Sequence, residues 1–302
     1  MYYGWYQLAF VRELTAPVTA TCIGDMPLML VRDSKGICAF DPVCPHRGAN
    51  LAFGGKLEGN VIICPFHGHR IGLSSVSQES FKVRSYRTIT VGGLVFVLLA
   101  ERHDNGFGAW LDHLNESHLF TPGFTITAPV PAELVIENGF DRAHFQTVHG
   151  LNEQPDLFLS PSHDGELNVQ GTLSSLAFDN VWHRDQKDVA HTNSSFLARV
   201  FSPNLCMTRL GDGASDYWVI SGATPKGERG CTIRVSVAVP SSAGTVSPEP
   251  HAIHSLLRDS KLAYEQDLAI WEHRFNNAAS HFMPDDDLVK VFQDFCLRFS
   301  QA

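Results

Sequence analysis

The chain has 302 residues, of which 44% are hydrophobic and 18% charged, and its formal net charge is −9. This length is enough for one large globular domain or two ordinary ones. The negative charge argues against a broad nucleic-acid-binding face and against strong attraction to anionic membranes. The longest apolar run, residues 94–100, is far shorter than the roughly 20 residues of a membrane-spanning helix.

Seven cysteines, an odd number, are scattered along the chain, and the N-terminal segment lacks the basic start and apolar core of a signal peptide. We therefore expect a cytoplasmic protein with reduced thiols rather than a disulfide framework. Reduced thiols are also the form that binds metals.

Strands and turns are expected over the first hundred residues, beginning with a strand in the N-terminal segment. The apolar segments 27–32 and 37–40 flank the turn sequence DSKG, and the segments 88–91 and 94–100 flank two glycines. Both patterns indicate β-hairpins. We predict a small all-β domain over residues 1–105.

Two cysteine–histidine pairs lie in this domain. Cys44 and His46 belong to CPHRG, Cys64 and His67 belong to CPFHG, and seventeen residues separate the two pairs. Two thiolates and two neutral imidazoles can hold either a zinc ion or one [2Fe–2S] cluster of the Rieske type. Each pair here supplies one ligand of each kind from a loop with proline and glycine, whereas a zinc finger groups Cys with Cys and His with His. The pattern favours the cluster.

A second group of candidate ligands lies in the segment PAELVIENGFDRAHFQTVHG, which we expect to be largely helical. It contains Asn138, Asp141, His144 and His149. On a helix, Asp141 and His144 would be neighbours on one face, but His144 and His149 would point about 140° apart. The two imidazoles can meet at one metal only if the helix bulges or ends between them, and the glycine at 150 favours an ending.

Strand-like runs follow residue 165, and then an amphipathic helix is expected from about His251 to Asn277. Its apolar stripe consists of Ile253, Leu256, Leu257, Ala263, Tyr264, Ile270 and Trp271. Asp267 lies on this stripe, where a carboxylate is costly unless it is paired or bound to metal. Asp259, Glu265 and Glu272 are expected to be solvated.

Two histidines and one carboxylate are the ligands of mononuclear non-haem Fe(II) sites that keep open positions. We therefore predict that Asp267 completes a site with His144 and His149. The alternative for Asp267 is a buried arginine or a role as a cap.

Together these residues resemble the catalytic α subunits of Rieske non-haem iron oxygenases over nearly the whole chain. Ketosteroid 9α-hydroxylase oxygenases and cholesterol 7-desaturases are similar through CPHRGANLAFGG, CPFHG and the tail EQDLAIWEHR…DDDLVKVFQDFCLRFS. Ala49 and Phe66 stand where respiratory Rieske proteins have two further, bridging cysteines, and His69 stands where many oxygenases have Trp. Residues 150–250 match these relatives poorly.

The resemblance implies an α+β fold, with an all-β Rieske domain at 1–105 and an α+β catalytic domain at 106–302 that has a central antiparallel sheet and helices. It implies a [2Fe–2S] Rieske cluster on the two Cys/His pairs and a mononuclear Fe(II) on His144, His149 and Asp267. Asn138 and Asp141 match the iron segment, and Asp141 would connect His144 to His67 of a neighbouring subunit. A homotrimer follows from that connection.

The activity implied is O₂-dependent hydroxylation or desaturation of a hydrophobic, steroid-like or polycyclic substrate. NAD(P)H would act through a separate ferredoxin or ferredoxin reductase, because the chain has no GxGxxG fingerprint. Three alternatives remain: a Rieske demethylase or arene oxygenase for small aromatics, an electron-transfer Rieske protein, and a zinc protein. The apolar residues available for a pocket are Phe140, Phe145, Leu151, Phe158, Phe178, Trp182, Phe196 and Trp218.

Overall fold

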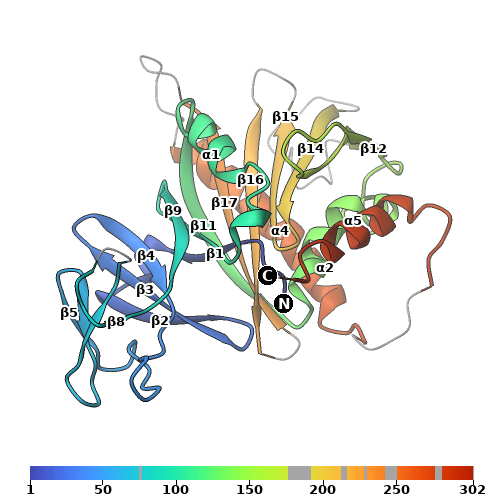
Figure 1. Cartoon of the computed structure of the whole chain (residues 1–302). Helices are drawn as coiled ribbons and strands as arrows, with labels where there is room; N and C mark the ends of the chain where they lie inside the picture. Colours follow the sequence, from blue (N-terminus) through green and yellow to red (C-terminus); the bar gives the residue numbers. More distant parts are fainter. Residues whose placement is uncertain are drawn as a thin grey trace.

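The structure is a computed structural model that describes residues 1–74, 77–175, 192–211, 216–227, 230–241, 250–275 and 281–301. The N-terminal third forms two small sheets, and the rest forms a large sheet that carries helices on its face and edge (Figure 1). The two termini lie side by side, where the Tyr3 N–H donates to the Phe299 carbonyl at 2.9 Å. No helix among the described residues is long and apolar enough to cross a membrane.

The N-terminal part is all β, as predicted. One sheet has the order β1 (Trp5–Phe10), β10 (Leu94–Leu98), β9 (Ser85–Val91), β4 (Gly36–Phe40), β3 (Met26–Asp33), β2 (Val18–Ile23). The other has the order β5 (Lys56–Glu58), β6 (Val61–Ile63), β7 (Arg70–Gly72), β8 (Phe81–Lys82). Short 3₁₀ turns, η1 (Val11–Glu13) and η2 (Glu101–His103), follow β1 and β10.

Both predicted hairpins are confirmed. β3 pairs with β4 so that Asp33 faces Gly36, and the Asp33 carboxylate accepts the backbone N–H groups of Lys35 and Gly36. β9 pairs with β10 across Gly92 and Gly93, whose φ angles of 52° and 84° suit glycine best.

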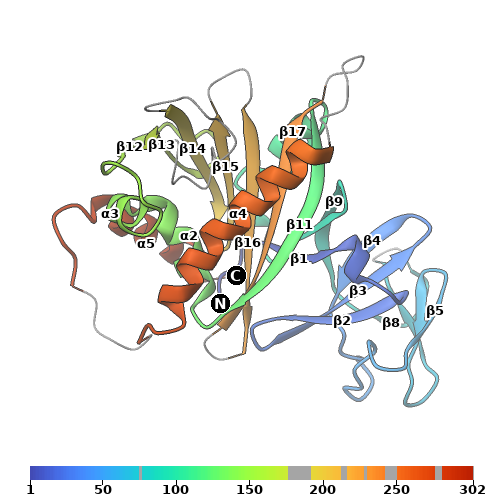
Figure 2. The ribbon, with the colours of Figure 1, turned by 180° about the vertical axis from the view of Figure 1, so that it is seen from behind.

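The large sheet is antiparallel throughout, as predicted for the catalytic part. Its order is β11 (His118–Ala128), β17 (Gly230–Pro240), β16 (Tyr217–Lys226), β15 (Leu205–Gly211), β14 (Thr192–Ser202), β13 (Leu167–Ser175), β12 (Asp156–Ser160). The helix α4 (Pro250–Trp271) crosses one face of this sheet obliquely (Figure 2). The other helices are α1 (Phe107–Asn115), α2 (Ala132–Glu137), α3 (Arg142–Thr147) and α5 (Asp287–Leu297), with a 3₁₀ turn η3 (Asn138–Phe140).

The first strand ties the two parts together. Ser202 donates its hydroxyl to the Trp5 carbonyl at 2.6 Å, and Thr224 donates to the Gln7 carbonyl at 3.1 Å. Trp5, Phe107 and many residues of the large sheet also share one hydrophobic cluster. The division of the chain at residue 105 stays a prediction.

The segment 131–150 is largely helical, as predicted, and is divided into α2, η3 and α3. Three expectations for α4 need correction. The helix α4 ends at Trp271 rather than near residue 277; its closing turn is tightened by a bond from the His273 N–H to the Ile270 carbonyl at 3.1 Å. Ile270, expected to be buried, is 57% exposed, whereas Asp259, expected in solvent, is 7% exposed.

Candidate functional site

The two Cys/His loops of the N-terminal part have the same backbone geometry. In the first, the Cys44 N–H donates to the Ala49 carbonyl at 2.8 Å, and Gly48 donates back to the Cys44 carbonyl at 2.9 Å. In the second, Cys64 donates to His69 at 2.9 Å, and the glycine at 68 donates back at 3.0 Å. The two glycines have φ angles of 74° and 70°, so the left-handed turn explains why each loop carries one.

The loops bring all four predicted cluster residues to one end of the domain. Cys44 and Cys64 are each 2% exposed. Both are free thiols, and a hydrogen bond joins them. His46 and His67 are exposed, and their rings meet edge to face with centroids 4.9 Å apart. This arrangement suits a cluster with its cysteine side buried and its histidine side at the surface.

Backbone N–H groups surround both sulfurs. Burial raises the pKa of the Cys44 thiol, although the N–H groups of His46 and Arg47 point at it. Burial also acts to raise the pKa of Cys64, but bonds from the Phe66 N–H, the Cys44 thiol and the His67 N–H outweigh it and lower that pKa. Such N–H groups stabilise sulfur that carries negative charge.

A single zinc ion fits these four residues poorly. Zinc holds its ligands at about 2.0 to 2.3 Å in a tetrahedron, so neighbouring donor atoms lie roughly 3.5 Å apart. Among the described residues, only one group of at least three His, Cys, Asp or Glu side chains has all its donor atoms within 4.8 Å of one another, and it lies elsewhere in the chain.

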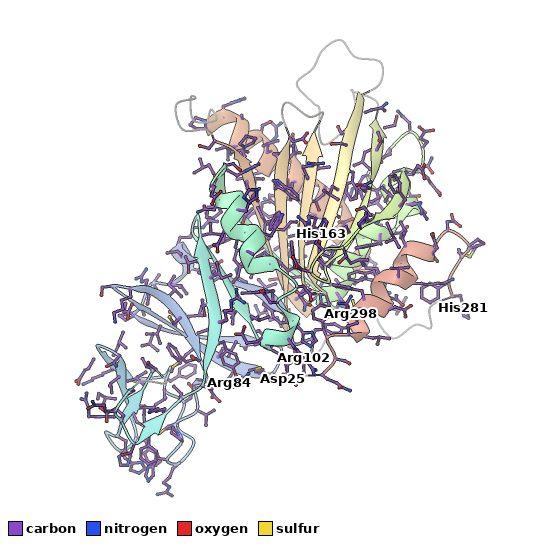
Figure 3. The ribbon with its side chains drawn as sticks, turned by 45° about the horizontal axis from the view of Figure 1, so that its top comes forward. Asp25, Arg84, Arg102, His163, His281 and Arg298 are labelled. Atoms are coloured by element: carbon purple, nitrogen blue, oxygen red, sulfur yellow. The ribbon has the colours of Figure 1, made fainter. Side chains whose placement is uncertain are left out.

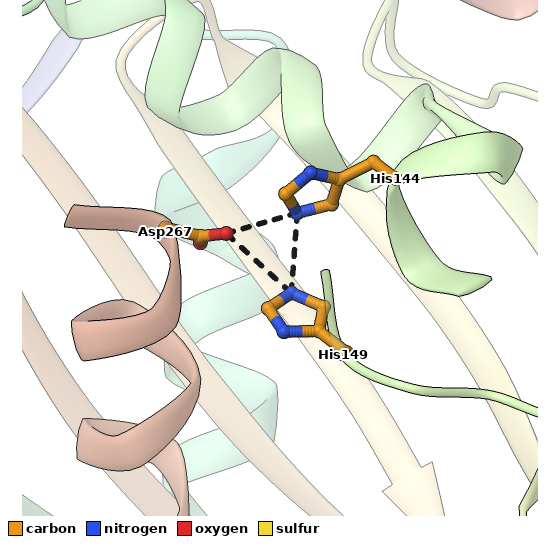
Figure 4. A group of neighbouring side chains, drawn as sticks. All are labelled: His144, His149 and Asp267. Atoms are coloured by element: carbon orange, nitrogen blue, oxygen red, sulfur yellow. Dashed lines mark hydrogen bonds and ion pairs between the residues drawn. The ribbon is translucent and has the colours of Figure 1, made fainter. Parts of the chain in front are cut away.

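That other group is His144, His149 and Asp267 (Figure 4). The chain brings the two histidines together because α3 ends at Thr147, between them, as the spacing required. His144 Nε2 and His149 Nε2 are 3.1 Å apart, and Asp267 Oδ1 lies 3.0 Å from the first and 3.6 Å from the second. Asp267 is 6% exposed, on the buried face of α4.

The donor set fits a divalent metal ion. A point in the plane of the three atoms and equidistant from them lies about 1.9 Å from each, close to the 2.0 to 2.2 Å of metal–ligand bonds. These three side chains would hold the ion, and two histidines with one carboxylate are the ligand set of non-haem iron sites that keep positions open for O₂. Although His144 lies near it, the buried Asp267 Oδ1 receives no well-directed hydrogen bond from the described residues. A cation would satisfy that oxygen.

Gln266 controls the orientation of His149, and sequence reasoning missed it. Its Oε1 lies 3.0 Å from His149 Nδ1, so that nitrogen donates and Nε2 keeps the lone pair that a metal needs. Burial lowers the pKa of His149, which favours the same neutral ring. The only indication in the sequence was the position of Gln266 next to Asp267.

Asp141 acts locally as the N-cap of α3. Its Oδ1 accepts the backbone N–H of His144 at 3.0 Å, and the described contacts of this chain do not include a bond to the His144 ring. Asn138 lies nearby in η3, and its buried side-chain nitrogen has no hydrogen-bond partner among the described residues.

The three converging side chains lie on the wall of a cavity of about 110 Å³. Its apolar lining includes Val135, Phe145, Leu173, Phe196, Leu210 and Val219. Of the aromatic and aliphatic residues considered from the sequence, Phe145 and Phe196 therefore line it. Phe140 and Leu151 pack in the core, Phe158 is half exposed, and Trp218 packs on Trp110. Phe178 and Trp182 lie outside the described residues.

Two family models match the chain. The Rieske [2Fe-2S] domain matches residues 4–79, and the 3-ketosteroid 9alpha-hydroxylase C-terminal domain matches residues 100–292. Together with the fold and the two groups of candidate ligands, these matches define the class of protein. The chain belongs to the Rieske non-haem iron oxygenases, with a catalytic domain of the 3-ketosteroid 9alpha-hydroxylase type.

Relatives include two cholesterol 7-desaturases. The protein of Bombyx mori is 22% identical over 333 aligned residues, 98% of this chain and 69% of its own length. That of Hemicentrotus pulcherrimus is 33% identical over 297 residues, 86% of this chain and 61% of its own. The oxygenase component of dicamba O-demethylase from Stenotrophomonas maltophilia is 27% identical over 51% of this chain and 49% of its own. The alignments thus span 49% to 69% of the relatives' own lengths.

Solved structures share the fold. NdmB of Pseudomonas putida CBB5 superimposes with a TM-score of 0.67 at 18% identity, over 97% of this chain and 89% of its own. Dicamba monooxygenase bound to 3,6-dichlorosalicylic acid gives 0.66 at 19% identity, over 98% and 96%.

Proposed function

We propose that the chain is the oxygenase component of a system that hydroxylates or desaturates a hydrophobic substrate with O₂. Electrons come from NAD(P)H through a separate ferredoxin or ferredoxin reductase. The observation that carries this proposal is the convergence of His144, His149 and Asp267 on the wall of an apolar cavity. A protein that only transfers electrons needs neither the group nor the cavity.

Each proposed ligand set has a distinct task. Cys44, His46, Cys64 and His67 hold the [2Fe–2S] cluster, and His144, His149 and Asp267 hold the mononuclear iron. When bound, the cluster supplies single electrons and the mononuclear iron supplies O₂ activation.

The surrounding side chains prepare the site for this chemistry. Gln266 keeps the proton of His149 on Nδ1, away from the metal-facing nitrogen. Phe145 and Phe196 exclude water from the space beside the three ligands, where a reactive oxygen species would otherwise be quenched. Asn138 borders the same space with a free amide N–H and is proposed to contact ligands there.

The size of the cavity bears on the substrate. A cavity of about 150 Å³ in another protein binds one benzene ring, so the space described here corresponds to about one ring. We propose that one ring of a steroid-like or polycyclic substrate enters it. The same size supports a second candidate, oxidation or demethylation of a small aromatic, and dicamba O-demethylase is among the relatives.

Electron transfer is proposed to run between subunits of a homotrimer. Within one chain, the helix α3 and the loops beside β5 and β8 lie on opposite sides of the molecule (Figure 2). A head-to-tail ring would bring the cluster end of one chain to the α3 end of the next. Asp141 would then connect His67 of one subunit to His144 of its neighbour.

Iron content tests the proposal. The protein as isolated should hold about three irons per chain and show the visible absorption of a Rieske cluster. His144→Ala should hold about two irons, with the same visible absorption and no turnover. The control is His163→Ala, because His163, labelled in Figure 3, is exposed in the turn before β13 and belongs to neither proposed ligand set. A colourless protein, or three irons retained in His144→Ala, would refute the assignment.

A further inference from the structure

Two hydroxyl groups meet on the wall of the cavity. Tyr264, on α4, donates its hydroxyl to Ser221 Oγ, on β16, across 2.7 Å. Both residues line the cavity. They lie 43 residues apart in the sequence, so only the packing of α4 on the sheet brings them together.

The pair has one hydroxyl proton that its mutual hydrogen bond does not use. Two hydroxyls carry two protons, and their mutual bond uses only one of them, whichever group donates. Among the described residues, no other side chain or carbonyl accepts the second proton. A hydroxyl turned into an apolar cavity without an acceptor loses free energy, and a ligand atom that accepts it recovers that loss.

Ser260 provides the contrast. It also lines the cavity and lies one helical turn before Tyr264, but its hydroxyl donates to the Leu256 carbonyl at 2.8 Å. Its proton is therefore used within the helix, and it has none left to donate to a ligand. Asn138 also borders the cavity with a free amide N–H, but Ser221 and Tyr264 are the pair of hydroxyls on its wall that keep a proton to donate.

The pair lies close to the proposed metal ligands. Tyr264 precedes Asp267 by three residues, so it lies on the same face of α4, about 4.5 Å along the helix axis. Both residues line the same cavity. The hydroxyl pair and the three proposed ligands therefore border the same space, and a ligand in it contacts both.

We propose that the Ser221–Tyr264 pair binds an oxygen atom of the substrate, a ring hydroxyl or ring carbonyl, and so sets which part of the ring faces the reaction site. This deepens the proposed function and rests on it. The substrate class becomes a hydrophobic ring compound with one oxygen substituent, rather than a pure hydrocarbon.

Anaerobic titration of the iron-containing protein with cyclohexanol and with methylcyclohexane tests the inference. The two probes have similar size and differ in one hydroxyl. The quantity of interest is the ratio of the dissociation constant of methylcyclohexane to that of cyclohexanol, measured by calorimetry or NMR. In the double variant Ser221→Ala/Tyr264→Phe, which removes both hydroxyl protons, this ratio should fall about 5- to 10-fold, the value of one hydrogen bond. In the control Ser260→Ala it should stay within about twofold.

If this double variant fails to fold, Ser221→Cys/Tyr264→Phe gives an independent measurement. The thiol is only a weak donor and fills the space of the serine hydroxyl, and the phenylalanine ring can keep the edge-to-face packing that Tyr264 makes on Phe124 at 6.2 Å. The ratio should fall here too. An equal ratio in wild type and in the double variants would overturn the inference and leave a trapped water as the partner of the spare proton. Failure of both probes to bind the wild type would overturn it as well.

Iron is counted on the same samples. If the mononuclear site holds iron but the substitutions leave the ratio unchanged, the binding of a substrate oxygen by Ser221 and Tyr264 is refuted and the proposed function is not. Absence of mononuclear iron refutes the proposed function, whereas a lowered ratio would still support the binding site.

Discussion

Replacement of Gln266 by leucine should weaken metal binding without removing any proposed ligand. The side chain accepts the Nδ1 proton of His149 at 3.0 Å, and leucine has a similar size but no acceptor. Without the acceptor, the His149 ring can rotate or shift its proton to Nε2, the nitrogen that faces Asp267 and His144. The metal would then have to restore the correct tautomer on binding.

The expected loss of metal affinity follows from the contact between Gln266 and His149. Partners that orient a ligating histidine contribute about 10- to 100-fold to metal affinity, which corresponds to about 1.4 to 2.7 kcal/mol. The cluster loops lie on the other side of the molecule, so the cluster should be unaffected.

The assay is anaerobic equilibrium dialysis of Fe(II) into protein whose mononuclear iron has been chelated while the cluster remains. Gln146→Leu is the matched control, because Gln146 lies on α3, two residues after His144, and among the described residues its side chain bonds to the Asn152 carbonyl, at 3.3 Å. Gln266→Glu keeps an acceptor and should bind iron nearly as well as the wild type. If Gln266→Leu binds Fe(II) within twofold of Gln146→Leu, the role given to Gln266 is wrong.

Two further predictions concern carboxylates of the catalytic part. Asp141→Asn should keep the α3 cap, the melting temperature and both metal sites but lose most turnover. Asp141→Ala should also lose about 1 kcal/mol of stability, because it removes the cap. Full turnover in Asp141→Asn would exclude the proposed electron transfer between subunits. Burial acts to raise the pKa of Glu166, but bonds from the Asp164 N–H and the Arg199 guanidinium outweigh it and lower that pKa to about 2. Because the folded pKa is depressed, Glu166 should stabilise the fold fully above about pH 4.5, by roughly 3 kcal/mol, and lose this as pH falls towards 2. Urea unfolding should therefore show that the difference between wild type and Glu166→Gln shrinks from pH 6 to pH 3, and a constant difference would contradict this account.

Local sequence patterns were enough to predict the two Cys/His loops. The spacing of Cys44, His46, Cys64 and His67, with a glycine after each pair, follows from a loop whose hydrogen bonds all lie within six residues. The sequence also predicted that His144 and His149 converge only if the helix bulges or ends between them, because an uninterrupted helix would point them about 140° apart. In each case the decisive contacts are short in sequence.

The helix α4 shows where such reasoning stops. The helical period correctly predicted that Asp267 is buried. It wrongly predicted that Ile270 is buried and that Asp259 is exposed. These two residues lie only about 20° apart around the helix axis, so no periodic pattern can separate them. The helix crosses the sheet obliquely (Figure 2), so the same flank is covered at Asp259, beside Tyr217, and uncovered at Ile270.

The sequence by itself therefore determined the fold class, the hairpins and the sets of residues that could bind metal, because these depend on backbone period and on spacing along the chain. Only the tertiary structure decided that Gln266 holds His149 and that Ser221 meets Tyr264 in the cavity. Those pairs join a helix to segments more than forty residues away, and their contact depends on how α4 is rotated and tilted on the sheet. That orientation results from the packing of the whole domain, which no local pattern contains.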